Sequence, residues 1–138
     1  MQNKIKIQTE VNAPIEKVWN IWSDPAHITQ WNNASDDWHT PKAENDLRTG
    51  GSFCFSMAAK DGSFSFDFGG TYTEVIEYKK IEYILEDQRM VEVYFSTIEL
   101  GKTKIIELFD PENENPRELQ EQGWQAILNN FKKYTESL

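Results

Sequence analysis

From Gly51 to Phe109 the chain alternates between apolar and polar residues almost without interruption. A two-residue period places every second side chain on the same face of a strand, so this run favours half-buried β-strands over helices. The apolar positions are Phe53, Phe55 and Met57; Phe64, Phe66 and Phe68; Ile81, Tyr83 and Leu85; Val91, Val93 and Phe95; and Ile105 and Phe109. Short polar turns divide the run, which therefore predicts five consecutive antiparallel strands with one apolar face.

The segments before this run predict one more strand and two short helices. Residues 4–12 alternate in the same way, which favours a strand. Apolar residues then recur at helical spacing over 14–22. Asp24 before a proline is typical of an N-cap, so a second short helix is expected to end near Trp31. Residues 32–50 have no sustained period and are predicted to form a long loop.

The segment after the run predicts a long helix. Asn115 and Pro116 suit an N-cap and a first helical position, and Glu118 suits a capping box. An apolar stripe at helical spacing continues from Leu119 to near the C-terminus. We therefore predict a single α+β domain over residues 1–138. Its curved antiparallel sheet of about six strands, with two short helices, wraps a long C-terminal helix.

Four runs of residues resemble a known family, and the resemblance covers essentially the whole chain. They are residues 36–41, 43–51, 61–68 and 122–134, which contain the strings DDWHTP, AENDLRTGG, DGSFSFDF and QGWQAILNNFKKY. These runs look like bacterial members of the family named for homology to the activator of the heat-shock-protein-90 ATPase. The order of elements is similar to the START-like or SRPBCC superfamily, which implies the helix-grip (Bet v-like) fold. The superfamily includes lipid carriers, hydrophobic-ligand binders, polyketide cyclases and oxygenase domains, and no catalytic motif carries over residue by residue.

Charge and cysteine usage exclude several classes of partner. A net charge of −9 and a pI near 4.7 repel phosphate backbones, and no Lys/Arg cluster offsets that field, so nucleic acid is not expected as a partner. No segment approaches the roughly 20 apolar residues that span a bilayer. The chain starts with alternating residues rather than a secretory signal, and Cys54 is its only cysteine. We expect a cytoplasmic protein without disulfides.

The sequence offers little support for metal or nucleophile chemistry. His27 and His39 are the only imidazoles, and the spacing of His39 from Asp36 and Asp37 matches no metal-binding pattern. No G-x-S-x-G elbow or triad is present. We therefore predict no metal, no cofactor and no catalytic residue.

Glu107 is the least ordinary position of the strands. It is in phase with Ile105 and Phe109, so its carboxyl group enters an apolar interior if those two residues face the helix. Burial would then raise its pKa unless a partner is present. In the alternative, Ile106 and Leu108 face inward and Glu107 lies in water, since this strand carries apolar residues on both faces.

Aromatic residues make up 13% of the chain, enough to line a cavity between the sheet and the helix or to fill the core completely. The leading hypothesis is a hydrophobic or lipid-like small molecule bound in such a cavity, with its mouth near the 32–50 segment and the short helices. The candidate binding residues are Trp31, Trp38, His39, Phe53, Phe55, Phe66, Phe68, Tyr83, Phe95, Glu107, Trp124 and Leu128.

Two other function classes remain open at this point. A co-chaperone-like module would bind a protein partner through its acidic surface. A cyclase-like or dehydratase-like enzyme would use Glu107 and His39 as acid and base. A defined cavity favours the ligand binder or the enzyme, whereas a solid core with an exposed apolar patch favours the protein-interaction module.

Overall fold

The structure is a computed structural model and describes residues 4–138. Within that range the chain forms seven strands and three helices. Their order is β1 (Ile5–Val11), α1 (Ile15–Ser23), α2 (Pro25–Trp31), β2 (Trp38–Asn45), β3 (Ser52–Ala59), β4 (Ser65–Ile76), β5 (Lys80–Leu85), β6 (Met90–Glu99), β7 (Lys102–Phe109) and α3 (Arg117–Glu136).

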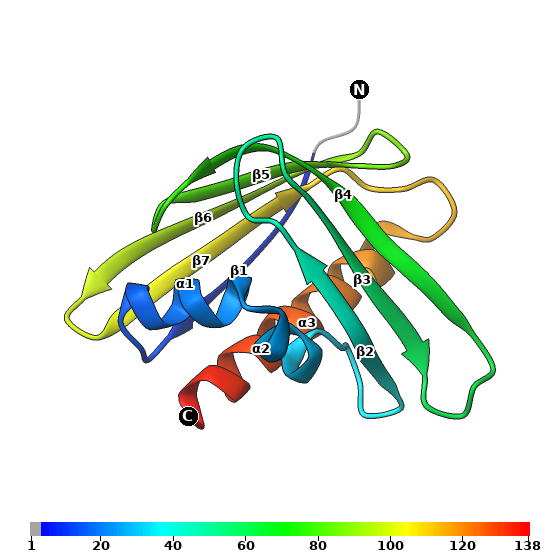
Figure 1. Ribbon diagram of the computed structural model, residues 1–138, viewed down its shortest axis with the longest axis horizontal. Coiled ribbons are helices and arrows are strands. Elements are labelled where there is room, and N and C mark those ends of the chain that lie inside the picture. Colours follow the sequence, from blue (N-terminus) through cyan, green and yellow to red (C-terminus); the bar gives the residue numbers. More distant parts are fainter. Residues whose placement is uncertain (1–3) are drawn as a thin grey trace.

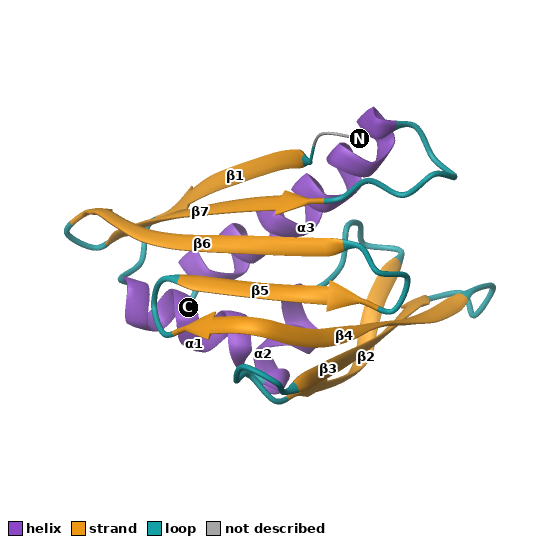
Figure 2. Cartoon of the chain, turned by 90° about the horizontal axis from the view of Figure 1, so that it is seen from above, coloured by secondary structure: helices purple, strands orange, loops and turns teal. Residues whose placement is uncertain are grey.

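The strands form one antiparallel sheet in the order β1-β7-β6-β5-β4-β3-β2. The first strand of the chain therefore pairs with the last, and the other strands follow as a meander. Figure 1 shows the curved sheet arching over α3, and Figure 2 shows that all three helices lie on one face of it. The predicted α+β arrangement of a curved sheet, two short helices and a long C-terminal helix is confirmed. None of the helices in residues 4–138 is both long and apolar enough to cross a membrane.

The prediction of a loop over 32–50 is wrong, because β2 lies within it and raises the strand count from about six to seven. β2 is an edge strand that pairs with β3, for example Glu44 with Cys54. Its polar sequence and the register shift between His39 and Lys42, around Pro41, hide any two-residue period. Edge strands tolerate charged residues and proline because one side of their backbone is unpaired. Pairing with β3, rather than local pattern, makes this segment a strand.

The N-terminal cap predicted for α2 is present, whereas the one predicted for α3 is absent. The Asp24 carboxylate accepts a hydrogen bond from the Ala26 backbone N–H at 3.0 Å and caps α2, as predicted. At α3 the predicted capping box is absent, and the Asn115 side chain instead donates to Glu112 at 2.6 Å. The polar segment before α3 is therefore held by a hydrogen bond between two of its own side chains, Asn115 and Glu112.

The side chains are buried most completely where α1 and α3 cover β1, β7 and β6. Inward side chains of these strands are fully or almost fully buried, including Val93, Ile105 and Phe109. From α3, Leu128 and Phe131 complete this core. Each buried aliphatic or aromatic side chain contributes roughly 1.5–3 kcal/mol relative to an exposed one.

The β3–β4 hairpin is covered less completely. Phe64, Phe66 and Phe68 share a face as predicted, while the Asp67 carboxylate on the opposite face accepts a hydrogen bond from Ser56 at 3.0 Å. Phe64 is nevertheless 60% exposed and Phe66 is 42% exposed. Figure 1 shows the reason, since the tip of this hairpin projects to one side of α3. The predicted alternation is correct, but burial against the helix extends only to Phe68.

Candidate ligand-binding site

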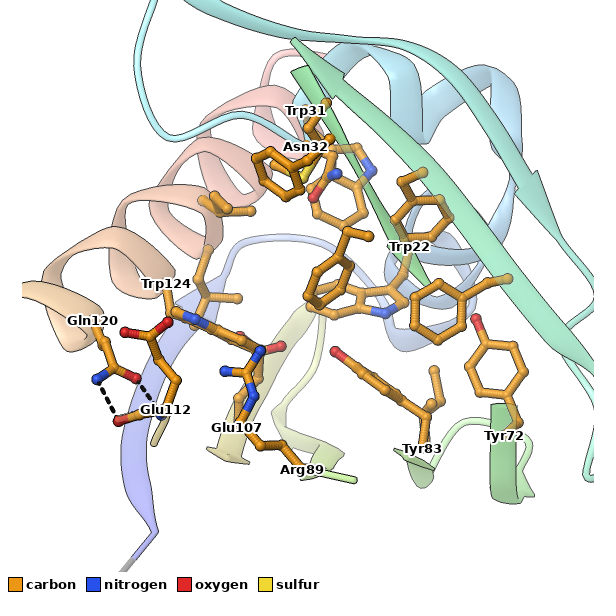
Figure 3. A pocket seen from close by; sticks show the side chains of 18 of the residues that line it. Trp22, Trp31, Asn32, Tyr72, Tyr83, Arg89, Glu107, Glu112, Gln120 and Trp124 are labelled. Carbon is orange, nitrogen blue, oxygen red and sulfur yellow. Dashed lines mark hydrogen bonds between the residues drawn. The ribbon is translucent and has the colours of Figure 1, made fainter. Parts of the chain in front are cut away.

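A cavity of about 330 Å³ lies between the concave face of the sheet and α3 (Figure 3). The sheet supplies its largest wall, because every second residue of β3, β4 and β5 points toward the helix. The side chains on this wall are mainly aromatic: Phe53, Phe55 and Met57 of β3, Phe66, Phe68 and Tyr72 of β4, and Ile81 and Tyr83 of β5.

Contacts between rings hold this wall together. The Phe53 ring lies at the centre, with ring centroids 4.9 Å from Tyr83, 5.0 Å from Phe55 and 5.2 Å from Tyr72. Tyr72 is fixed further because its hydroxyl donates to the Asn45 side chain of β2 at 2.5 Å. The wall is therefore a preformed surface rather than a set of loose side chains.

The two short helices close one end of the cavity. Trp22 of α1 and Trp31 of α2 lie with ring centroids 5.0 Å apart, and each ring is 4.9 Å from Phe131 of α3. The Trp31 indole N–H donates to the Ile21 carbonyl at 3.0 Å, which satisfies its one polar atom. Asn32, at the end of α2, completes this end.

Helix α3 forms the wall opposite the sheet. Trp124, Ile127 and Leu128 face the cavity, together with Gln120 near the start of the helix. The Trp124 ring stacks on Phe109 of β7 with centroids 3.9 Å apart and planes 10° apart. One face of this indole is thus packed against the core, while the residue as a whole is only partly buried.

Glu107 of β7 brings a carboxyl group into this apolar surrounding. Its side chain is buried, with 6% of the residue exposed, and it lines the cavity. Its neighbours in register are Ile7 of β1 and Val93 of β6, so no cross-strand partner is polar. Among residues 4–138 no hydrogen bond or ion pair reaches its carboxyl group. Burial therefore raises the pKa of Glu107 to about 8.

Two other polar side chains accompany Glu107. Figure 3 shows Tyr83 reaching into the cavity from β5 and Arg89 reaching in from the turn between β5 and β6. Burial first, and the nearby Glu107 carboxylate second, raise the pKa of Tyr83 well above its usual range. The Arg89 guanidinium is paired with Asp87, with Nε and Oδ2 2.6 Å apart. The hydroxyl of Tyr83 has no hydrogen-bond partner within the described residues.

The cavity opens between the β7–α3 segment and the β3–β4 hairpin, as indicated by the lining residues that remain exposed. These are Phe66 of β4 and Asn115. Gln120 fixes the segment before α3 by accepting from the Glu112 backbone N–H at 2.9 Å and donating to the Glu112 carbonyl at 3.3 Å (Figure 3). It also donates to the Asn115 carbonyl at 2.8 Å. The mouth predicted near residues 32–50 and the short helices is therefore misplaced, because only Asn32 of that segment lines the cavity and the short helices close one end of it.

The structure brings together nine of the twelve candidate residues around this cavity and leaves three outside. The nine are Trp31, Phe53, Phe55, Phe66, Phe68, Tyr83, Glu107, Trp124 and Leu128. Trp38 packs outside against Phe64 and Phe66, with centroids 6.1 and 6.0 Å apart. His39 is exposed on β2, and Phe95 is buried against Trp19 and Trp22.

Ten residues that line the cavity were not among the candidates predicted from the sequence. They are Trp22, Asn32, Met57, Tyr72, Ile81, Arg89, Glu112, Asn115, Gln120 and Ile127. Met57 and Ile81 were identifiable from the strand alternation, and Ile127 from the helical stripe. Arg89, Glu112 and Asn115 lie in turns, where no period predicts the direction of a side chain.

This chain is similar to one known protein family and to bacterial proteins of known structure. The family described as "Activator of Hsp90 ATPase homolog 1-like protein" matches residues 12–136. The AHSA1-like protein from Aeromonas hydrophila, known from a solution NMR structure, is 46% identical with a TM-score of 0.87, and the match covers 96% of this chain and 93% of that protein. Chr148 from Cytophaga hutchinsonii is 55% identical with a TM-score of 0.85, covering 99% and 94%.

A more distant likeness supports the fold alone. CV1439 from Chromobacterium violaceum is 22% identical with a TM-score of 0.85, and the match covers 98% of this chain and 99% of that protein. No curated protein matches the chain. The predicted resemblance to bacterial START-like proteins of this family is confirmed by the two closer structures and the family match.

Proposed function

Because the chain belongs to the family of proteins like the activator of Hsp90 ATPase homolog 1, and because its fold leaves a cavity between the sheet and α3, we propose that it binds a hydrophobic or lipid-like small molecule in that cavity. The observation that carries this proposal is a preformed cavity of about 330 Å³ with aromatic walls. Small-molecule sites are typically concave, largely apolar and equipped with a few polar groups.

The size and chemistry of the cavity limit the ligand. Its volume lies near the lower end of the usual range for ligand sites, roughly 300–1,000 Å³, which favours a small molecule or one segment of a longer chain. Phe55, Phe68 and Trp124 are only partly buried although they are large and apolar. A bound apolar molecule would remove the remaining exposed surface of these rings from water, at roughly 25 cal/mol per Å².

A second candidate function is a protein-interaction module, and one exposed surface favours it. Trp38, Phe64 and Phe66 contact one another at the tip of the β3–β4 hairpin, and Phe64 and Phe66 are largely exposed. Such an apolar surface suits a partner protein. The enzyme alternative has less support, because His39 is exposed on β2 and does not line the cavity that holds Glu107.

The cytoplasm is the compartment that we propose for this function. Cys54 is the only cysteine of the chain, so no intramolecular disulfide is available to it. Proteins without disulfides are typical of reducing compartments.

Uptake of Nile red, a neutral dye whose fluorescence rises in apolar surroundings, tests the proposal. We expect one molecule to bind per native protein. Met57→Trp, which enlarges a partly buried lining residue, should reduce dye affinity by about tenfold or more by filling the cavity. Ile98→Trp makes a similar change at an exposed site outside the cavity and should leave affinity unchanged. Uptake only under partly denaturing conditions, or equal affinity in the two variants, would favour the protein-interaction module.

A further inference from the structure

The cavity contains one buried acidic group for which the described protein supplies no partner. Glu107 is 6% exposed, and within residues 4–138 nothing donates a hydrogen bond to its carboxyl group or forms an ion pair with it. Its neighbours in register, Ile7 and Val93, are apolar. Buried polar groups in folded proteins are nearly always hydrogen-bonded, so an unpartnered carboxyl group facing a cavity indicates that the ligand supplies the partner.

The other charged groups at the cavity already have partners within the protein. Arg89 is held by Asp87, with Nε and Oδ2 2.6 Å apart, and it forms no ion pair with Glu107. The Glu112 carboxylate accepts hydrogen bonds from the backbone N–H and the side-chain amide of Asn115, at 2.8 and 2.6 Å. On α3, Gln120 is neutral and bonded to the segment before the helix. Glu107 is therefore the lining carboxyl group that is left for a ligand.

The rings around Glu107 favour a positive charge. Aromatic faces attract ammonium groups, and the attraction grows when water is excluded. Tyr83 and Trp124 line the cavity together with Glu107, and Phe53 and Phe55 continue the same aromatic wall. The net charge of −9 adds a long-range field that draws cations toward the protein.

We propose that the natural ligand is a small organic amine, whose protonated nitrogen pairs with the Glu107 carboxylate while its apolar body lies against the aromatic wall. This proposal rests on the proposed function, since it specifies the chemical class that the same cavity binds. The Tyr83 hydroxyl, which has no partner among the described residues, is placed to accept a second hydrogen bond from the ammonium group.

Proton release is a direct consequence of this pairing. With a pKa of about 8, Glu107 carries its proton at pH 7 in the empty protein. An ammonium ligand stabilises the ionised form, so binding should release the carboxyl proton to solvent while the nitrogen keeps its own. The apparent affinity should therefore rise with pH up to about pH 8, approaching about tenfold per pH unit. The other titratable groups lining the cavity are Tyr72, Tyr83, Arg89 and Glu112. Burial raises the pKa of Tyr72 and of Tyr83 above the usual range, so both hydroxyls keep their protons across this interval.

Three ligands with the same body but different charge test the proposal by titration calorimetry at pH 7. They are 3-phenylpropylamine, which is a cation, 3-phenyl-1-propanol, which is neutral, and 3-phenylpropanoate, which is an anion. We expect the amine to bind at least about tenfold more tightly than the alcohol, and the anion to bind most weakly. Repeating the amine titration in two buffers of different ionisation enthalpy should show release of nearly one proton.

Two matched variants assign the effect to Glu107. Glu107→Gln keeps the shape of the side chain and should reduce amine affinity to about that of the alcohol, while alcohol affinity changes by less than about threefold. Glu121→Gln removes a carboxylate from an exposed position of α3 and should preserve the preference for the amine. A preference for the amine that persists in Glu107→Gln would overturn the proposal.

The outcomes separate this proposal from the proposed function. If the amine binds no better than the alcohol, or if neither binds to protein that takes up Nile red, the amine proposal is overturned and the hydrophobic site stands. If Nile red also fails to bind the native protein, both are overturned. A clear preference for the amine that depends on Glu107 and is accompanied by proton release supports both.

Discussion

The two halves of the sheet carry the same alternating pattern but differ in what covers them. On β1, β7 and β6 the inward side chains lie beneath α1 and α3, and Val93 and Phe109 have no exposed surface. On β3 and β4 the inward rings of Phe55 and Phe68 remain partly exposed, and Phe66 is largely exposed. We call these the closed half and the open half.

This difference shows that alternation sets the direction of a side chain and that coverage sets its burial. One helix of 20 residues crosses a sheet of seven strands, so it cannot close both halves equally. The space left over the open half is the cavity. Glu107 lies at the boundary, because it belongs to a strand of the closed half and faces the cavity.

The largest expected effect lies in the closed half. Phe109→Ala removes a fully buried ring that stacks on Trp124, so it should lower the free energy of unfolding by about 3–5 kcal/mol through lost burial and a residual void. Urea denaturation followed by tryptophan fluorescence measures the change. A loss below about 1 kcal/mol would mean that the closed half is not packed as described.

Glu107, at the boundary between the halves, should make the free energy of unfolding depend on pH. Its pKa is raised to about 8 in the folded state and is near its usual value in the unfolded state, so the folded protein keeps a proton that the unfolded chain loses. The contribution of Glu107 to the free energy of unfolding is therefore fully present below about pH 4.5. It should fall by about 1.4 kcal/mol per pH unit as the pH rises toward 8. The fall ends near the folded-state pKa.

Glu107→Gln should remove most of this slope, because the amide does not titrate. Free energies of unfolding from urea titrations at pH 5, 6, 7 and 8 compare the two proteins, with Glu121→Gln as the control that keeps the slope. Parallel pH profiles for the parent protein and Glu107→Gln would show that the carboxyl group is paired or hydrated in solution.

The smallest effect is expected for the same chemical change in the open half. Phe68→Ala removes a partly exposed ring at the cavity wall, so the free energy of unfolding should fall by only about 1–2 kcal/mol. Nile red affinity should decrease at the same time, whereas a folded Phe109→Ala protein should lose stability more than affinity. Equal losses of stability at Phe68 and Phe109 would remove the distinction between the halves.

Local pattern was sufficient for most elements and for the face of each strand. The strand β5 (Lys80–Leu85), the Asp24 cap of α2 and the later part of the α3 stripe, with Leu128 and Phe131, follow from residues that are neighbours in the sequence. The predicted start of that stripe is wrong, because Leu119 is 55% exposed. The same alternation placed Phe66 and Phe68 on the side of the cavity. These predictions succeed because side-chain direction in a strand or helix depends on backbone geometry over only a few residues.

The sequence by itself therefore determined the α+β class, the apolar face of the sheet and the residue types available to a site. Only the tertiary structure decided that Trp38–Asn45 pairs as an edge strand, that Glu107 is buried, and that Arg89 and Glu112 reach the cavity while His39 does not. Each of these outcomes depends on which distant segment lies opposite, since strand pairing and burial are set by contacts between elements far apart in the chain.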